Sequence, residues 1–173
     1  MKRPPPSLPA RALGWLAQRE QSRSELRRKL LRVVLQPPAG ADPTSADELN
    51  TEAAAAQVDE VLELLQAKGL LSDERFVESR VRVRSSGLGI RRIQMELARH
   101  GLKLPAQPLQ QLRDTELQRA TQLWQRRFGS AAQDLGERAR QMRFLAGRGF
   151  SGDVIRQVLA AGPGLQDDDA QDD

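Results

Sequence analysis

The amino-acid sequence predicts an all-α protein built from tandem three-helix repeats. Apolar residues return at helical spacing along most of the 173 residues. Aromatic residues make up only 3% and Tyr is absent, which is too little for the strands of a β-sandwich or barrel. One pattern also occurs three times: a Leu, a Gly four residues later, and then an apolar residue. These three observations favour stacked helical units.

The recurring pattern is typical of a helix end. A Schellman ending needs this spacing, because the glycine adopts a left-handed conformation and the next residue packs on the residue five positions earlier. Ser72 and Ser151 follow two of the copies and can begin new helices. Shared spacing in three places indicates duplicated units. The copies are Leu65–Gly69–Leu70, Leu97–Gly101–Leu102 and Leu145–Gly149–Phe150.

The first predicted repeat covers residues 8–71 and follows a proline-rich, disordered arm over residues 1–7. Its second helix can be capped by Ser22 or Ser24. An acidic loop insertion over residues 36–52 separates this helix from the third. The apolar residues expected to face the core are Leu13, Leu16, Ala17, Leu26, Leu30, Val33 or Val34, Val58, Val61, Leu62 and Leu65.

The second predicted repeat covers residues 72–113. Asp73 and Glu74 lie in the first turn after the Ser72 cap, where acidic side chains favour the helix dipole. Gly87 and Gly89 separate this helix from the next. Expected core residues are Phe76, Val77, Val81, Val83, Ile90, Ile93, Leu97, Leu109 and Leu112.

The third predicted repeat covers residues 114–162, and a disordered acidic tail follows over residues 163–173. Gly129 and Gly149 are expected to end two of its helices. Expected core residues are Leu117, Ala120, Trp124, Phe128, Leu135, Ala139, Met142, Val154, Ile155, Val158 and Leu159.

Charge is distributed unevenly along the chain. Residues 75–160 carry seventeen basic and seven acidic side chains, whereas residues 36–74 carry one basic and nine acidic ones. Arginine supplies 23 of the 27 basic residues, and its guanidinium binds phosphate or carboxylate through two parallel hydrogen bonds. Arg91 and Arg92 also begin a predicted helix, where positive charge is unfavourable. An anionic partner explains them; a local pair between Arg92 and Glu96 is the competing explanation.

The sequence offers little for catalysis. It has no Cys and one His, so common zinc sites and thiolate chemistry are excluded. His100 lies at a predicted helix end, where it favours the dipole. No phosphate-binding loop or nucleophile elbow is present. We therefore expect a protein that is not an enzyme and that has no catalytic residues, no cofactor and no metal. No apolar run reaches the ~20 residues needed to cross a bilayer, and we expect a cytoplasmic monomer.

Four segments carry a resemblance to the bacterial RecX family of recombinase regulators. They occur in the family's order and span about residues 8 to 160. The family usually has a short turn where this chain has residues 36–52, and the Asp-rich tail is not part of the shared pattern. The segments are Ser22-Arg-Ser-Glu-Leu-Arg-Arg-Lys-Leu30, Gly69-Leu-Leu-Ser-Asp-Glu-Arg-Phe76, Gly89-Ile-Arg-Arg-Ile-Gln-Met-Glu-Leu97 and Arg143-Phe-Leu-Ala-Gly-Arg-Gly-Phe150.

The resemblance implies that the three tandem three-helix repeats form an elongated, curved helical protein. It also implies binding in the groove of the RecA filament on single-stranded DNA, with inhibition of ATP hydrolysis and strand exchange. Two alternatives stay open. A sequence-independent DNA-binding module, on single- or double-stranded DNA, predicts binding to naked duplex with a steep salt dependence. A helical adaptor whose arginines only keep it in solution predicts binding neither to bare DNA nor to the RecA filament. Candidate partner-contacting residues, chosen by charge, are Arg27, Arg28, Lys29, Arg80, Arg84, Arg91, Arg92, Arg99, Arg126, Arg127, Arg143 and Arg148.

Overall fold

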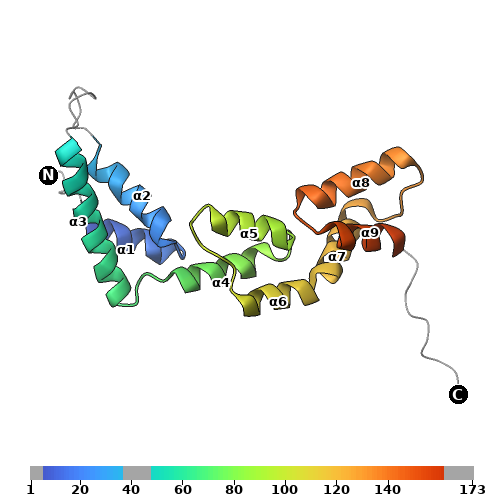
Figure 1. Ribbon diagram of the computed structural model, residues 1–173, viewed down its shortest axis with the longest axis horizontal. Coiled ribbons are helices and arrows are strands. Elements are labelled where there is room, and N and C mark those ends of the chain that lie inside the picture. The colour runs from blue at the N-terminus through green and yellow to red at the C-terminus, as the bar shows by residue number, and fades with distance from the viewer. Residues whose placement is uncertain (1–5, 37–47, 162–173) are drawn as a thin grey trace, which may run out of the picture. The chain divides into compact units, whose positions relative to one another are not determined.

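The computed structural model describes residues 6–36 and 48–161 (Figure 1). Within these residues it contains nine α-helices and no strand, which confirms the predicted all-α repeat fold. The chain forms two compact units, Met1–Ser79 and Arg80–Asp173. The boundaries of the three repeats stay a prediction. Residues 1–5 of the expected arm, residues 37–47 of the expected insertion and the expected tail lie outside the described residues.

Unit 1 contains α1 (Leu8–Gln18), α2 (Arg23–Val34) and α3 (Glu48–Ala67). Ser22 begins α2, and its Oγ accepts a hydrogen bond from the Glu25 amide at 3.1 Å. Ser7, which the sequence analysis placed in the arm, similarly caps α1 through the Ala10 amide. The core of this unit consists of Ala12, Leu26, Leu30, Val58, Leu62, Leu65 and Leu71.

Two expectations for unit 1 were wrong in detail. Leu13 is exposed, and Ala12 is buried in its place with Trp15 and Leu16 packed nearby, so α1 is rotated relative to the predicted face. Helix α3 begins at Glu48, so residues 48–52 are helical and are not part of a loop. The four alanines at 53–56, which directly follow this segment, favour helix and support the extension of α3 toward its N-terminus.

Helix α4 (Asp73–Arg84) contains the boundary between the two units. The Ser72 Oγ accepts a hydrogen bond from the Arg75 amide at 3.2 Å, which confirms the predicted cap. Phe76 and Val77 are buried as expected. Val83 is 63% exposed, so its assignment to the core was wrong.

Unit 2 continues with α5 (Ile90–Ala98), α6 (Ala106–Asp114), α7 (Glu116–Phe128), α8 (Leu135–Gly147) and α9 (Gly152–Ala161). Ile90, Ile93, Leu97 and Leu112 are buried as predicted. A core cluster joins α7, α8 and α9. Its buried members are Ala120, Trp124, Leu145, Phe150, Ile155, Val158 and Leu159.

Three apolar residues predicted for this core lie at the surface: Leu117, Leu135 (86% exposed) and Met142. On α8, the buried face carries Gln141 and Leu145 instead. Gln141 is buried because its Oε1 accepts a hydrogen bond from the Trp124 indole at 2.8 Å, and its Nε2 donates to the Ser130 carbonyl at 3.2 Å. A polar side chain thus takes the place that the apolar pattern gave to its neighbour Met142.

The glycine endings are confirmed. Gly69, Gly101 and Gly149 have φ values of 66°, 75° and 85°, in the left-handed region. After each, the next amide donates to the carbonyl five residues earlier: Leu70 to Leu65, Leu102 to Leu97, and Phe150 to Leu145. Gly129 ends α7 with φ 73°.

Candidate partner-binding surfaces

In unit 1 the basic side chains of α2 are largely held by acidic neighbours. Arg27 donates Nε and Nη2 to the two carboxylate oxygens of Asp59 on α3, at 2.8 and 2.9 Å. Arg23 adds a longer contact of 3.5 Å to Asp59. The hydrogen bonds from Arg27 lower the pKa of the Asp59 carboxyl and raise the pKa of Arg27 itself. This fork joins α2 to α3.

Lys29 is also engaged within unit 1. Its Nζ lies 3.1 Å from the Glu25 carboxylate and 2.7 Å from Gln21 Oε1, and it sits 5.6 Å from the centre of the Trp15 ring. Arg19 pairs with the same Glu25. Burial on its own would raise the pKa of Glu25, but the hydrogen bonds from Arg19 and Lys29 outweigh burial and lower that pKa.

Arg28 is the exception among the three candidates on α2. It is exposed, and its Nε donates only to the Ser24 carbonyl of its own helix at 3.3 Å. Among the described residues it forms no ion pair. In unit 1, therefore, two of the three candidate residues have local partners that account for their charge.

In unit 2, Arg80 and Arg84 share one acidic partner. Arg80 Nη1 lies 3.3 Å and Arg84 Nε lies 3.4 Å from the two carboxylate oxygens of Glu96 on α5. Arg80 and Arg84 are one helical turn apart, so they emerge on the same face of α4 and can share this partner. The structure gives Glu96 to α4 and not to Arg92, so the competing explanation for the positive charge at the start of α5 was wrong.

Backbone contact fixes the start of α5 against the end of α8. The Gly89 amide donates to the Arg148 carbonyl at 2.9 Å, and the Arg91 amide donates to the Gly149 carbonyl at 3.2 Å. A Cβ on Gly89 would lie 2.3 Å from the Gly149 backbone, and a Cβ on Gly149 would lie 2.5 Å from the Arg92 Cβ. Only glycine fits at either position, and this close approach places Arg91 and Arg92 beside α8 and α9.

A buried carboxylate compensates the positive charge at this helix start. The Oε1 of Glu116, from α7, accepts a hydrogen bond from the Ile90 amide at 3.1 Å, and its Oε2 accepts one from the Ser151 hydroxyl at 3.3 Å. Glu116 therefore supplies the negative charge that the first turn of α5 lacks in sequence. Sequence reasoning missed it, because Glu116 lies on a different helix.

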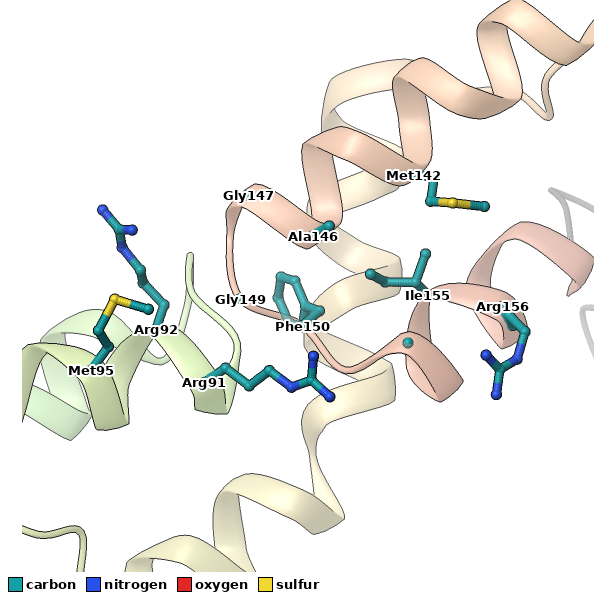
Figure 2. A pocket seen from close by; sticks show the side chains of 11 residues that line it. Arg91, Arg92, Met95, Met142, Ala146, Gly147, Gly149, Phe150, Ile155 and Arg156 are labelled. Carbon is teal, nitrogen blue, oxygen red and sulfur yellow. The ribbon is translucent and has the colours of Figure 1, made fainter.

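The α5, α8 and α9 helices enclose a surface pocket of about 560 Å³, which we call the α5–α9 pocket. In Figure 2 the Arg91 side chain extends from α5 toward α9, whereas Arg92 points away from α9. Phe150 lies between the helices with Ile155 near it, and Met142 lies farther along α8. The lining residues are Arg91, Arg92, Met95, Met142, Ala146, Gly147, Gly149, Phe150, Gly152, Ile155 and Arg156.

This pocket combines an apolar interior with a cationic rim. Met95 and Met142 are 49% and 43% exposed, which is high for long apolar side chains. Arg91 and Arg92 are exposed and form no ion pair with another described residue, whereas Arg156 pairs with Asp153. Met95 and Arg156 were not among the residues predicted for the site, and Met142 was predicted to lie in the core. Helical periodicity cannot predict which residues of three different helices line the same pocket.

A second cluster combines arginine with aromatic rings. Arg126, Arg127 and Arg148 line a shallow pocket with Leu123 and Phe144. The Arg148 guanidinium lies 5.2 Å from the centre of the Phe144 ring, which packs edge-on against Phe128 at 5.3 Å. These cation–π and edge-to-face contacts hold the guanidinium in place while leaving its edge in solvent.

Two further candidates lie apart from these clusters. Arg99 lines a pocket of about 420 Å³ with Arg84, Arg92 and His100, and Arg143 is exposed on α8. Arg119, by contrast, supports the fold: its guanidinium donates to the carbonyls of Ser85, Leu88 and Leu112 at 2.7–2.9 Å. Burial lowers the pKa of Arg119, and the nearby Glu116 partly offsets this effect.

The described residues contain no group of three or more His, Asp or Glu side chains arranged to hold a metal ion. None of the described helices is long and apolar enough to cross a membrane. His100 lies in the turn after α5, where its amide donates to the Leu97 carbonyl at 2.9 Å.

Comparison with known proteins matches two family models in unit 2 and the end of unit 1. The model described as "RecX, second three-helix domain" matches residues 72–103, and "RecX, third three-helix domain" matches residues 114–159. The crystal structure of RecX from Lactobacillus salivarius superposes with a TM-score of 0.58 at 17% identity. It covers 89% of this chain and 93% of that one, and it shows similarity of fold.

Curated relatives cover almost the whole chain. The regulatory protein RecX of Leptothrix cholodnii is 46% identical over 159 residues, which is 91% of this chain and 90% of the relative. That of Ralstonia pickettii is 39% identical over 170 residues, covering 97% and 96%. Identity at this level over nearly the full length of both chains establishes common ancestry and not only a shared fold. The chain therefore belongs to the RecX family of regulatory proteins.

Proposed function

We propose that this protein is a non-enzymatic negative regulator of the RecA recombinase. It binds in the groove of the RecA filament on single-stranded DNA and inhibits ATP hydrolysis and strand exchange. Membership of the RecX family supports the choice of partner. The observation that carries the binding mode is a group of exposed arginines on unit 2 that form no ion pair with another described residue: Arg91, Arg92, Arg126, Arg127 and Arg143.

These arginines suit a large anionic surface better than a small ligand. Arg91 and Arg92, Arg126 and Arg127, and Arg143 emerge from three different helices, so they contact several acidic or phosphate groups at once. One exposed pair contributes only about 0–1 kcal/mol, so affinity comes from many contacts made together. A filament repeats the same groups along its groove and thereby provides such multivalency.

The experiment is an ATPase titration with RecA on single-stranded DNA. Wild-type protein inhibits hydrolysis, and Arg91→Glu with Arg92→Glu loses most of the inhibition. Lowering the salt restores little, because reversed charges repel the partner. The matched control is Arg138→Glu with Arg140→Glu, which reverses two exposed arginines on α8 that line none of the pockets described above. If both variants inhibit equally, this placement of the binding surface is wrong.

The second candidate function is sequence-independent DNA binding, which the arginine–aromatic cluster around Phe144 favours. Exposed guanidinium planes stack on unpaired bases and pair with phosphates. This function predicts binding to DNA without RecA, with an affinity that falls steeply as salt rises. Binding measured on naked single strands, naked duplex and RecA filaments separates the two functions: a strong preference for filaments supports RecA regulation.

A further inference from the structure

We propose that the α5–α9 pocket binds the acidic C-terminal segment of the same chain, residues 162–173. This segment directly follows α9, one of the helices that line the pocket. Only the regulatory consequence of such binding rests on the proposed function. The binding itself is argued from the pocket's chemistry, the composition of the segment and the length of chain available.

The pocket suits a ligand with an apolar side chain next to several carboxylates. Phe150 and Ile155 provide apolar surface between the helices, and Met95 and Met142 offer adaptable thioether side chains. Arg91, Arg92 and Arg156 line the same pocket. Arginine binds carboxylates through a planar fork and keeps its charge at any physiological pH.

The C-terminal segment has this composition in this order. Gly162, Pro163 and Gly164 are residue types that disfavour a helix, and Leu165 is the one large apolar residue after them. Three consecutive aspartates, 167–169, follow after one glutamine, and two more end the chain. Five negative charges thus lie within eight residues of a single leucine.

The segment is long enough to reach the pocket. Ile155 lies six residues before the end of α9, which corresponds to about 9 Å along a helix. Four extended residues from Ala161 to Leu165 span up to roughly 13–14 Å, and eight span up to roughly 26–29 Å. The chain after Ala161 is therefore long enough for Leu165 to return to the level of Ile155, and all five aspartates follow within the next eight residues. Tethering gives an effective concentration on the order of millimolar, so weak contacts suffice.

Occupation of the pocket has a regulatory consequence if the proposed function holds. The aspartates neutralise Arg91 and Arg92, which the proposed function assigns to the recombinase filament. The segment then competes with the filament, and the apparent affinity falls by the fraction of molecules with an open pocket. The acidic segment would thus act as a mimic of the anionic partner within the same chain. Because its contacts with the arginines weaken as salt rises, the strength of inhibition would depend on salt concentration.

Methionine methyl NMR tests the binding directly, because the chain has only three methionines and Met95 and Met142 both line the pocket. Protein labelled at the methionine methyl groups is compared as the full chain, as a chain ending at Ala161, and as a full chain with all five C-terminal aspartates changed to Asn. We expect the Met95 and Met142 signals of the full chain to shift on deletion. The Asn variant resembles the truncated chain, and the shift shrinks at high salt.

Matched pocket variants complete the test. Arg91→Gln with Arg92→Gln makes the full chain resemble the truncated one, whereas Arg138→Gln with Arg140→Gln does not. Superimposable Met signals with and without the segment overturn the proposal. So does a shift that grows with protein concentration, because the occupant is then the segment of a second copy. No recombinase is present, so these outcomes are independent of whether the protein inhibits RecA.

Discussion

The two units differ in how their basic residues are balanced by acidic ones. In the described part of unit 1, basic residues are outnumbered by acidic ones, nine to ten, and Arg27 and Lys29 are held by Asp59 and Glu25. In the described part of unit 2, sixteen basic residues face six acidic ones. Charge in unit 1 therefore contributes to stability, and the excess charge of unit 2 is available to a partner. Arginine content alone does not distinguish the two roles; the position of the carboxylates does.

The largest effect on stability is expected at the glycine contact that positions Arg91 and Arg92 in unit 2. Gly149→Ala places a Cβ 2.5 Å from Arg92 in a left-handed backbone, so we expect a loss of about 3 kcal/mol or more in the free energy of unfolding. Gly69→Ala in unit 1 has the same left-handed backbone with nothing within 4 Å, and should cost only about 1–2 kcal/mol. Urea unfolding measures both, and equal losses would show that the backbone contact contributes little.

Arg119 tests whether the arginines of unit 2 are divided between support and binding. Arg119→Met removes donors from the Ser85, Leu88 and Leu112 carbonyls, so we expect a loss of about 2 kcal/mol. Arg113→Met, on the exposed side of α6, should change stability by less than about 0.5 kcal/mol. Thermal and urea unfolding should agree on this order; similar effects of both substitutions would mean that the carbonyl contacts do not stabilise the fold.

Acid titration tests the role of charge in unit 1. The folded protein lowers the pKa values of Glu25 and Asp59 below their ordinary values of 4.5 and 3.8. The stability that these groups provide is therefore complete above those ordinary values and is lost as the pH falls through the lower folded pKa values. At pH 7 we expect the free energy of unfolding of the wild type to exceed that of the double variant Glu25→Gln with Asp59→Asn by roughly 1 kcal/mol. The free energies of unfolding of the two proteins should become equal near pH 2, and a difference that persists there would argue against a charge effect.

Local features of the fold could be predicted from the sequence because they depend on neighbouring residues. The Ser72 cap and the glycine endings at 69, 101 and 149 each involve a few consecutive positions, and all were confirmed. Burial on α8 could not be predicted in the same way. Leu135 continues an apolar stripe but is exposed, whereas Gln141 is buried by a hydrogen bond to Trp124 on another helix. Periodicity identifies a face, and tertiary partners decide which face is inside.

The candidate site shows the same division. Charge at a helix start identified Arg91 and Arg92, and nothing local identified Arg156 or Met95 as their neighbours in the α5–α9 pocket. That neighbourhood depends on the approach of Gly89 to Gly149, which are far apart in the sequence. The acidic counterpart of the α5 start, Glu116, likewise comes from α7. Contacts between distant segments created every feature of the site that the sequence analysis missed.

We infer that the ion-paired arginines of unit 1 stabilise the fold and that Arg91, Arg92 and the other exposed arginines named under Proposed function bind the partner. This claim is tested most directly by measuring melting temperature and RecA inhibition on two double variants, Arg23→Glu with Arg27→Glu and Arg91→Glu with Arg92→Glu. We expect the unit 1 variant to melt several degrees lower, since about 1 kcal/mol corresponds to roughly 2–4 °C at this size, while keeping most of its inhibition. The unit 2 variant should melt within about two degrees of the wild type and lose most of its inhibition. Loss of inhibition by the unit 1 variant at temperatures where it is folded, with inhibition kept by the unit 2 variant, would contradict the claim.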